Sequence, residues 1–229
     1  MKCLILAGGF GTRLYPLTIN QAKALLGYKG KPIISHVVDK IPKNIDIMVN
    51  TNKKFEADFH QWQGTINRKV EILVEEVLSE DQKLGAVGSL NFWIENKPIV
   101  ADLLVIAGDN YFEFALAQFT ASYDGKHTLV AVYDIGDKGK ASQFGVVQLD
   151  GHRIAEFQEK PAKPKSSLVA TACYIFPQRI FPLLHQYCQR GKRDNLGSFI
   201  AYLIDKDEVH AYTFTELWID IGSIENFIK

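Results

Sequence analysis

The chain has 229 residues, of which 47% are hydrophobic, and it carries 26 basic and 26 acidic residues. This length is enough to bury a large core, and the balanced charge gives no basic face for nucleic acid or for an acidic membrane surface. No apolar run approaches the roughly 18 residues of a membrane span, and the apolar start at residues 2–7 meets glycine too early for a signal peptide. We therefore expect a cytoplasmic protein without nucleic-acid or membrane partners.

The first half of the chain alternates between apolar runs and amphipathic segments. Strands are predicted at residues 2–7, 46–50, 70–75 and 103–107, and helices at 32–40, 53–62 and about 84–95. Such alternation is typical of an α/β fold with a mainly parallel sheet, which binds ligands at the carboxyl ends of its strands. The segments that follow these strands should therefore meet at one edge of the sheet.

The second half is richer in strands. Strands are predicted at residues 128–133, 144–149, 154–157, 168–176 and 209–214, and helices at 177–189, at 196–204 and from Ser223 onward. The dipeptide Asp150-Gly151 predicts a hairpin between two of these strands. No linker, repeat or low-complexity tract interrupts the chain, so we expect one domain with a lid-like second lobe.

The cysteines stand at residues 3, 173 and 188, an odd number at unrelated spacings. They predict neither a disulfide framework nor a zinc motif. Cys3 and Cys173 lie in apolar runs, so we expect both thiols in the core.

A glycine-rich loop follows the first strand. Residues 6–14 read Leu-Ala-Gly-Gly-Phe-Gly-Thr-Arg-Leu, and Lys23 comes shortly after them. Glycines let main-chain amides approach an anion closely, and the cations Arg13 and Lys23 can neutralise its remaining charge. The loop therefore predicts a phosphate site for a polyanion such as a nucleotide, although the glycines alone are also compatible with a tight turn.

Two better-known phosphate loops do not fit this spacing. The dinucleotide fingerprint requires a third glycine where Leu14 stands. In a Walker A loop, Pro32 would occupy the position of the Mg²⁺-binding hydroxyl after Gly30-Lys31.

Two aspartates stand near strand ends. Asp109 follows the apolar run 103–107, and Asp220 lies in the apolar segment 217–222. Mg²⁺ binds one or two carboxylates together with water and substrate phosphate oxygens, so this pair predicts a magnesium site. The alternatives are a turn residue for Asp109 and a helix cap for Asp220, where Ser223 is the better cap.

A third group combines Gly145 with Glu159-Lys160-Pro161. Glu159 can accept hydrogen bonds from vicinal hydroxyls, Lys160 can bind a phosphate, and Gly145 leaves room for a ring-shaped ligand. Such a charged pair before proline is more often a solvated surface loop.

These motifs, taken in order, resemble the sugar-1-phosphate nucleotidyltransferase family, such as the glucose-1-phosphate thymidylyltransferases. The resemblance covers the whole chain and rests on residues 6–14, Lys23-Ala24-Leu25-Leu26, 84–88, 107–110, 144–147, 159–161 and 218–222. It implies a Rossmann-like nucleotidyltransferase fold in which a mainly parallel mixed sheet is flanked by helices and joined by a smaller β-rich sugar-binding lobe. Within a single domain of residues 1–229, residues 1–125 would bind the nucleotide and 126–229 the sugar phosphate.

The resemblance also implies roles for individual residues, with a nucleoside triphosphate and a sugar 1-phosphate as substrates and Mg²⁺ as cofactor. Arg13, Lys23, Asp109 and Asp220 would be catalytic, and the two aspartates would hold the metal. The nucleotide would contact Leu6, Ala7, Gly8, Gly9, Gly11, Thr12, Arg13, Glu75 and Gly85. The sugar phosphate would contact Gly145, Glu159, Lys160, Ala170, Thr171 and Tyr174.

Three residues depart from the family pattern. Gly27 stands where a proline is common, and Ala172 replaces a glycine, so that its methyl group could narrow the sugar pocket. Glu75 replaces the glutamine of thymidylyltransferases, which leaves the base open. Because Lys229 ends the chain directly after the last predicted helix, we expect no carboxy-terminal extension.

The reaction expected from this resemblance is in-line attack of a sugar-phosphate oxygen on the α-phosphorus of the triphosphate, with pyrophosphate as leaving group. That oxygen is already ionised, so no general base is required, and positioning and charge stabilisation dominate catalysis. The six histidines accordingly look scattered and without partners.

Two other functions stay open at this point. A cytidylyltransferase acting on a phosphorylated alcohol such as phosphocholine is disfavoured by Lys160, which would repel an ammonium group. A non-catalytic regulatory subunit is disfavoured because Arg13, Lys23, Asp109 and Asp220 are all present. The sugar, the base and a homo-oligomeric state are left open by the sequence.

Overall fold

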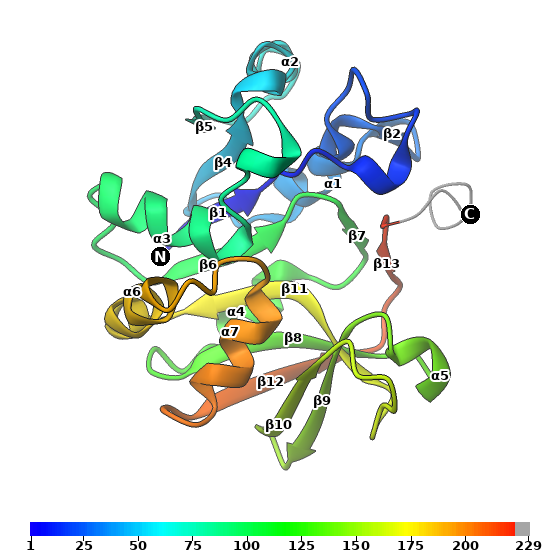
Figure 1. Cartoon of the computed structure of the whole chain (residues 1–229), viewed down its shortest axis with the longest axis vertical. Coiled ribbons are helices and arrows are strands. Elements are labelled where there is room, and N and C mark those ends of the chain that lie inside the picture. The colour runs from blue at the N-terminus through cyan, green and yellow to red at the C-terminus, as the bar shows by residue number, and fades with distance from the viewer. Residues whose placement is uncertain (223–229) are drawn as a thin grey trace.

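The computed structural model describes residues 1–222, and its centre is a nine-stranded sheet in the order β5-β4-β1-β6-β11-β8-β12-β10-β9 (Figure 1). The strands of this sheet are β1 (Lys2–Leu6), β4 (Asp46–Asn52), β5 (Val70–Glu75), β6 (Leu103–Ala107), β8 (Thr128–Asp134), β9 (Gly145–Asp150), β10 (Arg153–Glu159), β11 (Leu168–Phe176) and β12 (Val209–Phe214). Two small ladders complete the described strands: β2 (Gly27–Tyr28) with β3 (Lys31–Pro32), and β7 (Asn110–Phe112) with β13 (Trp218–Asp220).

The two halves of the sheet differ in strand direction. Strands β5, β4, β1 and β6 are parallel, as the alternating pattern predicts. Strand β11 is antiparallel to both β6 and β8 and thereby joins the halves. In the second half β11 also pairs with β9 through Val169 and Val146, so the ladder β11-β8-β12-β10-β9 closes into a ring. The result is the mixed α/β sheet that the family resemblance implies.

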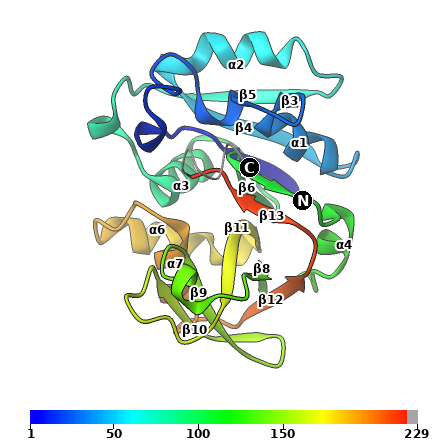
Figure 2. The same cartoon turned by 90° about the vertical axis from the view of Figure 1, so that its right-hand side faces the viewer.

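Helices cover both faces of the sheet. They are α1 (Ile33–Lys40), α2 (Glu56–Gln63), α3 (Ala86–Asn96), α4 (Leu116–Ala121), α5 (Lys138–Ala141), α6 (Phe181–Gln189) and α7 (Leu196–Leu203). Figure 2 shows α1 and α4 on one side and α3 and α6 on the other. None of these described helices is long and apolar enough to cross a membrane.

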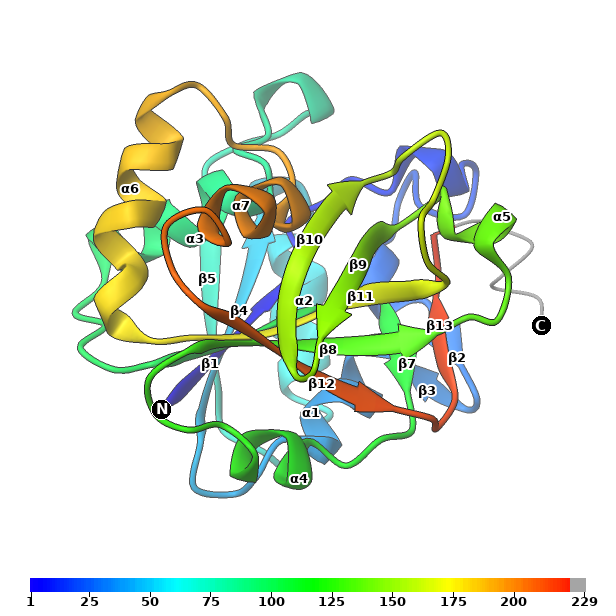
Figure 3. The same cartoon turned by 90° about the horizontal axis from the view of Figure 1, so that it is seen from below.

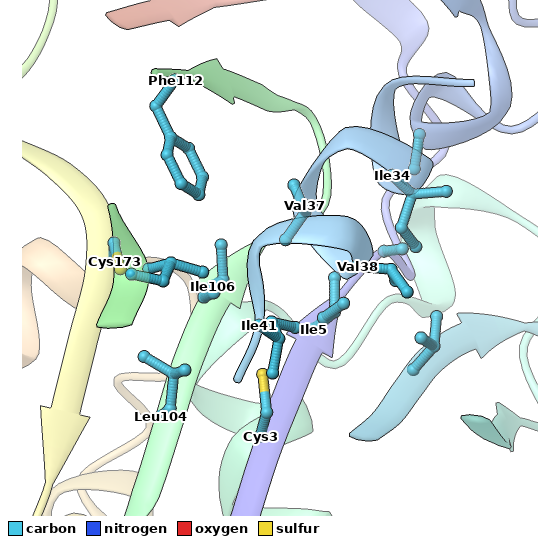
Figure 4. Packing of buried hydrophobic residues seen from close by; sticks show 14 of the residues in the cluster. Cys3, Ile5, Ile34, Val37, Val38, Ile41, Leu104, Ile106, Phe112 and Cys173 are labelled. Carbon is cyan, nitrogen blue, oxygen red and sulfur yellow. The ribbon is translucent and has the colours of Figure 1, made fainter. Parts of the chain in front are cut away.

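The period-two pattern of each buried strand builds two cores. On β1, Cys3 and Ile5 point to the core under α1, while Leu4 points to the core under α3, α6 and α7. Figure 4 shows the first of these cores, where side chains of α1 lie over β1 and β6. Cys3 and Cys173 are fully or almost fully buried, as predicted.

Several element boundaries differ from the sequence prediction. The segment predicted as one helix at 53–62 begins with a 3-10 turn (η3, Lys53–Phe55), which Asn52 caps by accepting a hydrogen bond from the amide of Phe55. The helix predicted from about 84 begins at Ala86, because Gly85 has a φ of +76° that a helix cannot contain. The short elements α4, α5, β2, β3 and β7 were not predicted. The helix expected from Ser223 lies outside the described residues.

The small β7·β13 ladder positions two functional residues, and Figure 1 shows its strands side by side. Asp220 pairs with Asn110, the direct neighbour of Asp109. The amide of Ile221 donates to the carbonyl oxygen of Asp109 at 3.3 Å. An exchange of backbone hydrogen bonds thus brings two aspartates together that lie far apart in the sequence.

Candidate active site

A pocket of about 390 Å³ lies between the carboxyl ends of the parallel strands and the bulged part of β11. A smaller hollow of about 240 Å³ adjoins it under the glycine loop. The larger volume is in the range of small-molecule sites. Arg13, Lys23 and Asp109 border both hollows, so they stand where the two meet.

Every residue predicted for the site borders one of these hollows. The larger pocket is lined by Leu6, Gly8, Gly9, Arg13, Lys23, Glu75, Gly85, Asp109, Gly145, Glu159, Lys160, Ala170, Thr171, Tyr174 and Asp220. The smaller hollow adds Ala7, Gly11 and Thr12. The structure therefore gathers the predicted residues in one place, and their individual roles stay predictions.

Side chains behind the glycine loop hold it by its carbonyl groups. Thr18 Oγ1 donates to the carbonyl oxygen of Gly11 at 2.7 Å, and Asn52 Nδ2 donates to that of Gly8 at 3.0 Å. Gly11 has a φ of +64°, a conformation that a side chain rarely tolerates. The loop is thus fixed in shape before any ligand arrives.

Lys23 forms an ion pair at the junction of the two hollows. Its Nζ lies 2.6 Å from Oδ2 of Asp109, and the lysine side chain is only 12% exposed. On the other side of Asp109, Asn110 Nδ2 donates to Oδ1 at 3.0 Å, and Trp218 Nε1 donates to Asn110 Oδ1 at 2.8 Å. Burial alone would raise the pKa of Asp109, yet the Lys23 ammonium and these hydrogen bonds hold it below its usual value.

Asp220 is in the opposite electrostatic situation. Burial is the main reason why its pKa is raised, and the negative charge of Asp109 is the second. The two neighbouring carboxylates repel each other, and a cation between them would relieve this repulsion. Each carboxylate oxygen has two lone pairs, so Asp109 can keep its present hydrogen bonds and still bind a metal. The donor set therefore fits a hard divalent ion such as Mg²⁺.

Glu75 lies deep in the pocket and is 3% exposed. Asn50 Nδ2 donates to its Oε1 at 2.6 Å. Burial raises the pKa of Glu75, and the hydrogen bonds that it accepts only partly oppose this effect. A ligand group that reaches this carboxyl group will therefore be sensitive to its protonation state.

The side of the pocket that the sequence predicts for the sugar phosphate is built around Glu159. A Cβ on Gly145 would collide with the ring of Phe157, and one on Gly197 with the carboxylate of Glu159, so these side chains keep their positions only because both residues are glycines. Burial is the main cause of the raised pKa of Glu159, which Lys160 opposes. Glu159 is half-buried at the end of β10 and lines the pocket, so the alternative of a solvated surface loop is wrong for it, whereas Lys160 is exposed.

Strand β11 carries a bulge where it borders the pocket. Its register against β8 shifts between Ala170 and Tyr174, and Ala172 inside the bulge has a φ of +55°. Thr171 Oγ1 donates to the carbonyl oxygen of Ala131 at 3.0 Å, which anchors the distorted segment. The methyl group of Ala172 lines the pocket, as its departure from the family pattern suggested. Gly27, another of the three departures, is exposed and borders neither hollow.

Several residues that line the pocket were not predicted from the sequence. Among them, Asn50 follows the predicted strand pattern, and its position at a parallel strand end is the one signal that could have pointed to it. The segment 194–195 has no such signal. It reaches the pocket because the amide of Ala86 donates to the carbonyl oxygen of Asp194 at 2.6 Å and that of Gly88 to Arg193 at 3.0 Å.

The expectation about the histidines is partly wrong. As expected, no histidine of the described chain borders either hollow. His127, His152 and His210, however, are not scattered: their rings form a group at the far end of the second-half sheet. Three separate chain segments supply them, which is why spacing in the sequence gives no signal.

Comparisons with known proteins point in one direction. The family model described as nucleotidyl transferase matches residues 2–229. The bifunctional protein GlmU of Methanocaldococcus jannaschii is 32% identical over 97% of this chain and 51% of its own length. The mannose-1-phosphate guanyltransferase of Debaryomyces hansenii is 26% identical over 100% of this chain and 63% of its own length. The chain thus spans about half to three-fifths of the length of these curated relatives.

Solved structures agree with this result. A Bacillus anthracis protein assigned as a glucose-1-phosphate thymidylyltransferase, in complex with sucrose, has a TM-score of 0.82 at 26% identity, covering 99% of this chain and 92% of that one. A UDP-glucose pyrophosphorylase complexed with UDP-glucose has a TM-score of 0.81, covering 99% and 95%, at 20% identity. The second likeness concerns the fold alone.

Proposed function

This chain belongs to the nucleotidyl transferase family, and on that basis we propose that it transfers a nucleoside monophosphate from a triphosphate to a sugar 1-phosphate. The products are a nucleoside diphosphate sugar and pyrophosphate. The resemblance of the whole chain to sugar-1-phosphate nucleotidyltransferases supports this reaction, and so do the activities after which its relatives are named.

One observation carries the proposal: Arg13, Lys23 and Asp109 stand where the two hollows meet. A triphosphate over the glycine loop would extend along the smaller hollow, and an acceptor in the larger one would approach it from the side of Glu159 and Lys160. The cations then lie beside the point where the two substrates react.

The chain's own residues need only position the substrates and balance charge. A phosphate oxygen is already ionised at neutral pH, so the reaction needs no histidine from the described chain at the pocket. Arg13 and Lys23 stabilise the negative charge that develops on the transferred group, which is a large term in such reactions. The ion pair with Asp109 directs the Lys23 ammonium group at this point.

Asp109 and Asp220 are the residues that we propose hold Mg²⁺. When bound, the ion would neutralise phosphate charge and orient the triphosphate. Burial is the main cause of the raised pKa of Asp220, and the charge of Asp109 is the second; a cation bound by both carboxylates would offset that repulsion.

We assign the base to the region of Glu75 and Gly85, and we leave its identity to experiment. A carboxylate accepts from a base that presents two donors, whereas a protonated carboxyl group pairs with a base that presents one donor and one acceptor. The raised pKa of Glu75 makes both states relevant.

Three free, buried cysteines support our proposal that the protein works in the reducing cytoplasm. A homo-oligomeric state stays a prediction.

Pyrophosphate release tests the function. The purified protein is offered each of the five nucleotides ATP, GTP, CTP, UTP and dTTP in turn, with glucose 1-phosphate, mannose 1-phosphate, N-acetylglucosamine 1-phosphate or phosphocholine, with and without Mg²⁺. We expect release only with a sugar phosphate and Mg²⁺. Release with phosphocholine alone would favour the cytidylyltransferase alternative, and binding without release in every pair would favour a regulatory subunit.

A further inference from the structure

A group of histidines and carboxylates lies at the end of the sheet opposite the pocket. Strand β9 starts in the pocket at Gly145 and ends at Asp150, so the β9–β10 turn with His152 lies at its far end. The same end holds His127, just before β8, and His210, the second residue of β12. Arg153 pairs with His210, and Figure 3 shows the β9–β10 turn beside β12.

Asp124 is oriented by the turn that it caps. Its Oδ1 accepts hydrogen bonds from the amides of Lys126 and His127, each at 2.8 Å. Its Oδ2 lies 2.6 Å from Nδ1 of His127 and 3.7 Å from Nδ1 of His210. One carboxylate oxygen thus holds the backbone while the other faces two imidazole nitrogens.

His210 is held from its other side. Its Nε2 lies 2.7 Å from Oε1 of Glu208. A carboxylate at one ring nitrogen fixes the proton there and leaves the lone pair of the other nitrogen for a ligand. In this geometry the Nε2–H of His210 donates a hydrogen bond to Glu208, so the lone pair of Nδ1 points toward Asp124. For His210 this arrangement is typical of histidines that bind metal ions. The Nδ1 of His127 instead lies at hydrogen-bond distance from Asp124, so an ion that binds this nitrogen displaces the Nδ1 proton to solvent, and its binding depends on pH.

The cluster is packed, yet solvent can reach it. The side chains of His127 and His210 are 16% and 15% exposed, and their ring centroids lie 4.5 Å apart. Asp124 is 39% exposed, so an ion can enter beside it. The ligand atoms of the three residues all lie within 4.8 Å of one another.

We propose that Asp124, His127 and His210 form a binding site for a borderline transition-metal ion, with Zn²⁺ as the best fit, separate from the active site. Two imidazoles and one carboxylate are a donor set that Zn²⁺ takes, with water in the fourth position. Tetrahedral coordination at about 2.0–2.1 Å needs ligand atoms roughly 3.3 Å apart. The distances of 2.6 and 3.7 Å from Asp124 Oδ2 to the two Nδ1 atoms bracket that spacing, and the two imidazole nitrogens lie within 4.8 Å of each other. Binding therefore requires the three side chains to adjust until all three separations are about 3.3 Å.

The bound ion would connect two segments that approach each other only in the folded chain. His127 and Asp124 belong to the connection between α4 and β8, and His210 belongs to β12. An ion that binds the folded protein and not the unfolded chain raises stability by mass action. Zn²⁺ should therefore raise Tm without being required for catalysis.

The test uses the full chain freed of metal by chelation, with millimolar Mg²⁺ present to fill the aspartate pair in the pocket. Zn²⁺ is titrated by calorimetry, and Co²⁺ is added separately to follow its visible absorption. The variants are His210→Ala and Asp124→Asn, the second of which keeps an oxygen for the backbone amides. His185→Ala is the matched control, because that exposed histidine pairs with a single carboxylate, Glu95.

We expect one Zn²⁺ per chain, tetrahedral Co²⁺ absorption and a higher Tm for the unchanged protein and for His185→Ala. Both site variants should bind at least tenfold more weakly and lose the Tm shift, while pyrophosphate release persists as evidence of folding. His152→Ala should behave as the unchanged protein.

Three results would overturn the proposal, two of them from the variants. One is Zn²⁺ binding with equal affinity by both site variants and the unchanged protein. The other is loss of binding in His152→Ala with retention in Asp124→Asn, which would move the ion to the alternative group of His152, Glu208 and His210. No binding at micromolar Zn²⁺ would reduce the cluster to a hydrogen-bonded network and contradict the proposal as well.

Discussion

The two sides of the pocket, which we propose bind the nucleotide and the acceptor, differ in which residues adopt left-handed backbone conformations. On the nucleotide side, the residues with positive φ at the pocket are glycines, Gly11 and Gly85. On the acceptor side they are Lys160 and Ala172, with φ of +46° and +55°. Left-handed conformations cost non-glycine residues about 1–2 kcal/mol. The acceptor side thus retains side chains at strained positions, which indicates that those side chains matter to what it binds or to how it is shaped.

Charge separates the two sides as well. Cations outnumber carboxylates in the hollow under the glycine loop, where Arg13, Lys23 and Lys83 stand with Glu80 and Asp109. The acceptor end instead pairs the carboxylate of Glu159 with the single cation of Lys160. A highly charged phosphate chain and a hydroxyl-rich acceptor would require this distribution. Substitutions on the two sides should therefore affect different kinetic constants.

The largest effect is expected at the carboxylate pair between the two sides. Asp220→Asn should abolish turnover, because it removes a full charge from the proposed Mg²⁺ site at almost constant volume. Pyrophosphate release in excess Mg²⁺ measures this, with the exposed residue Asp81 changed to asparagine as control. A near-normal rate for Asp220→Asn would take this residue out of the metal site.

The same variant should gain stability. The folded-state pKa of Asp220 is raised, so the folded protein binds the proton more tightly than the unfolded chain. Stability is therefore lost as the pH rises from the unfolded pKa through the folded one, and at pH 7 the ionised group is a penalty. The uncharged amide introduced by Asp220→Asn removes this penalty, so Tm measured in EDTA should rise at pH 7 and this gain should shrink in acid. An equal or lower Tm at pH 7 would contradict the raised pKa.

Lys23→Ala should lower kcat by about 10²- to 10³-fold, since its contact strengthens as charge develops on the transferred phosphorus. Lys29→Ala is the matched control, because Lys29 also pairs with a carboxylate, Glu113, but borders neither hollow. Steady-state kinetics with both substrates decides the point. A change confined to KM would make Lys23 a binding residue only.

Glu159→Ala should raise KM for the sugar 1-phosphate about 5- to 150-fold, which corresponds to roughly 1–3 kcal/mol for hydroxyls left without an acceptor. Lys160→Ala should act in the same direction and more strongly, through the lost counter-charge. Calorimetric titration with the triphosphate alone should show almost unchanged affinity. If that affinity fell equally steeply, the two sides would not be separate sites.

Glu75→Gln should change the ranking of the triphosphates by kcat/KM while KM for the acceptor stays constant, because an amide presents one donor and one acceptor in every protonation state. The exposed neighbour offers a control in Glu76→Gln. The ranking by kcat/KM is measured by competition between pairs of triphosphates, followed by product analysis. An unchanged ranking would place the base elsewhere.

The smallest effect concerns backbone strain in β11. Ala172→Gly should stabilise the protein by about 0.5–1 kcal/mol, the difference between relief of a left-handed alanine and the entropy cost of glycine. Ala170→Gly, on the same strand with regular pairing, should instead destabilise it by about 0.5–1 kcal/mol. Urea unfolding of both variants measures whether each substitution raises or lowers the free energy of unfolding. Equal losses in the two variants would show that the bulge stores no strain.

The sequence by itself determined the features that depend on neighbours along the chain. Alternating apolar patterns predicted the parallel half of the sheet, because strand and helix periods are local properties. The glycine loop with Arg13 and Lys23, and the position of Asp109 after a buried strand, followed in the same way. Parallel strand ends meet at one edge, so Glu75 and Asp109 could also be expected near the loop.

Only the tertiary structure decided the contacts between distant segments. The chain of hydrogen bonds from Trp218 through Asn110 to Asp109 joins residues about a hundred positions apart, and it exists because β13 pairs with β7. The left-handed conformation of Ala172 belongs to the β11 bulge. The group of histidines and carboxylates around His210 forms because three separate chain segments meet at one end of the sheet. No local pattern encodes these meetings, because their geometry is set by how the strands are ordered and how the cores pack.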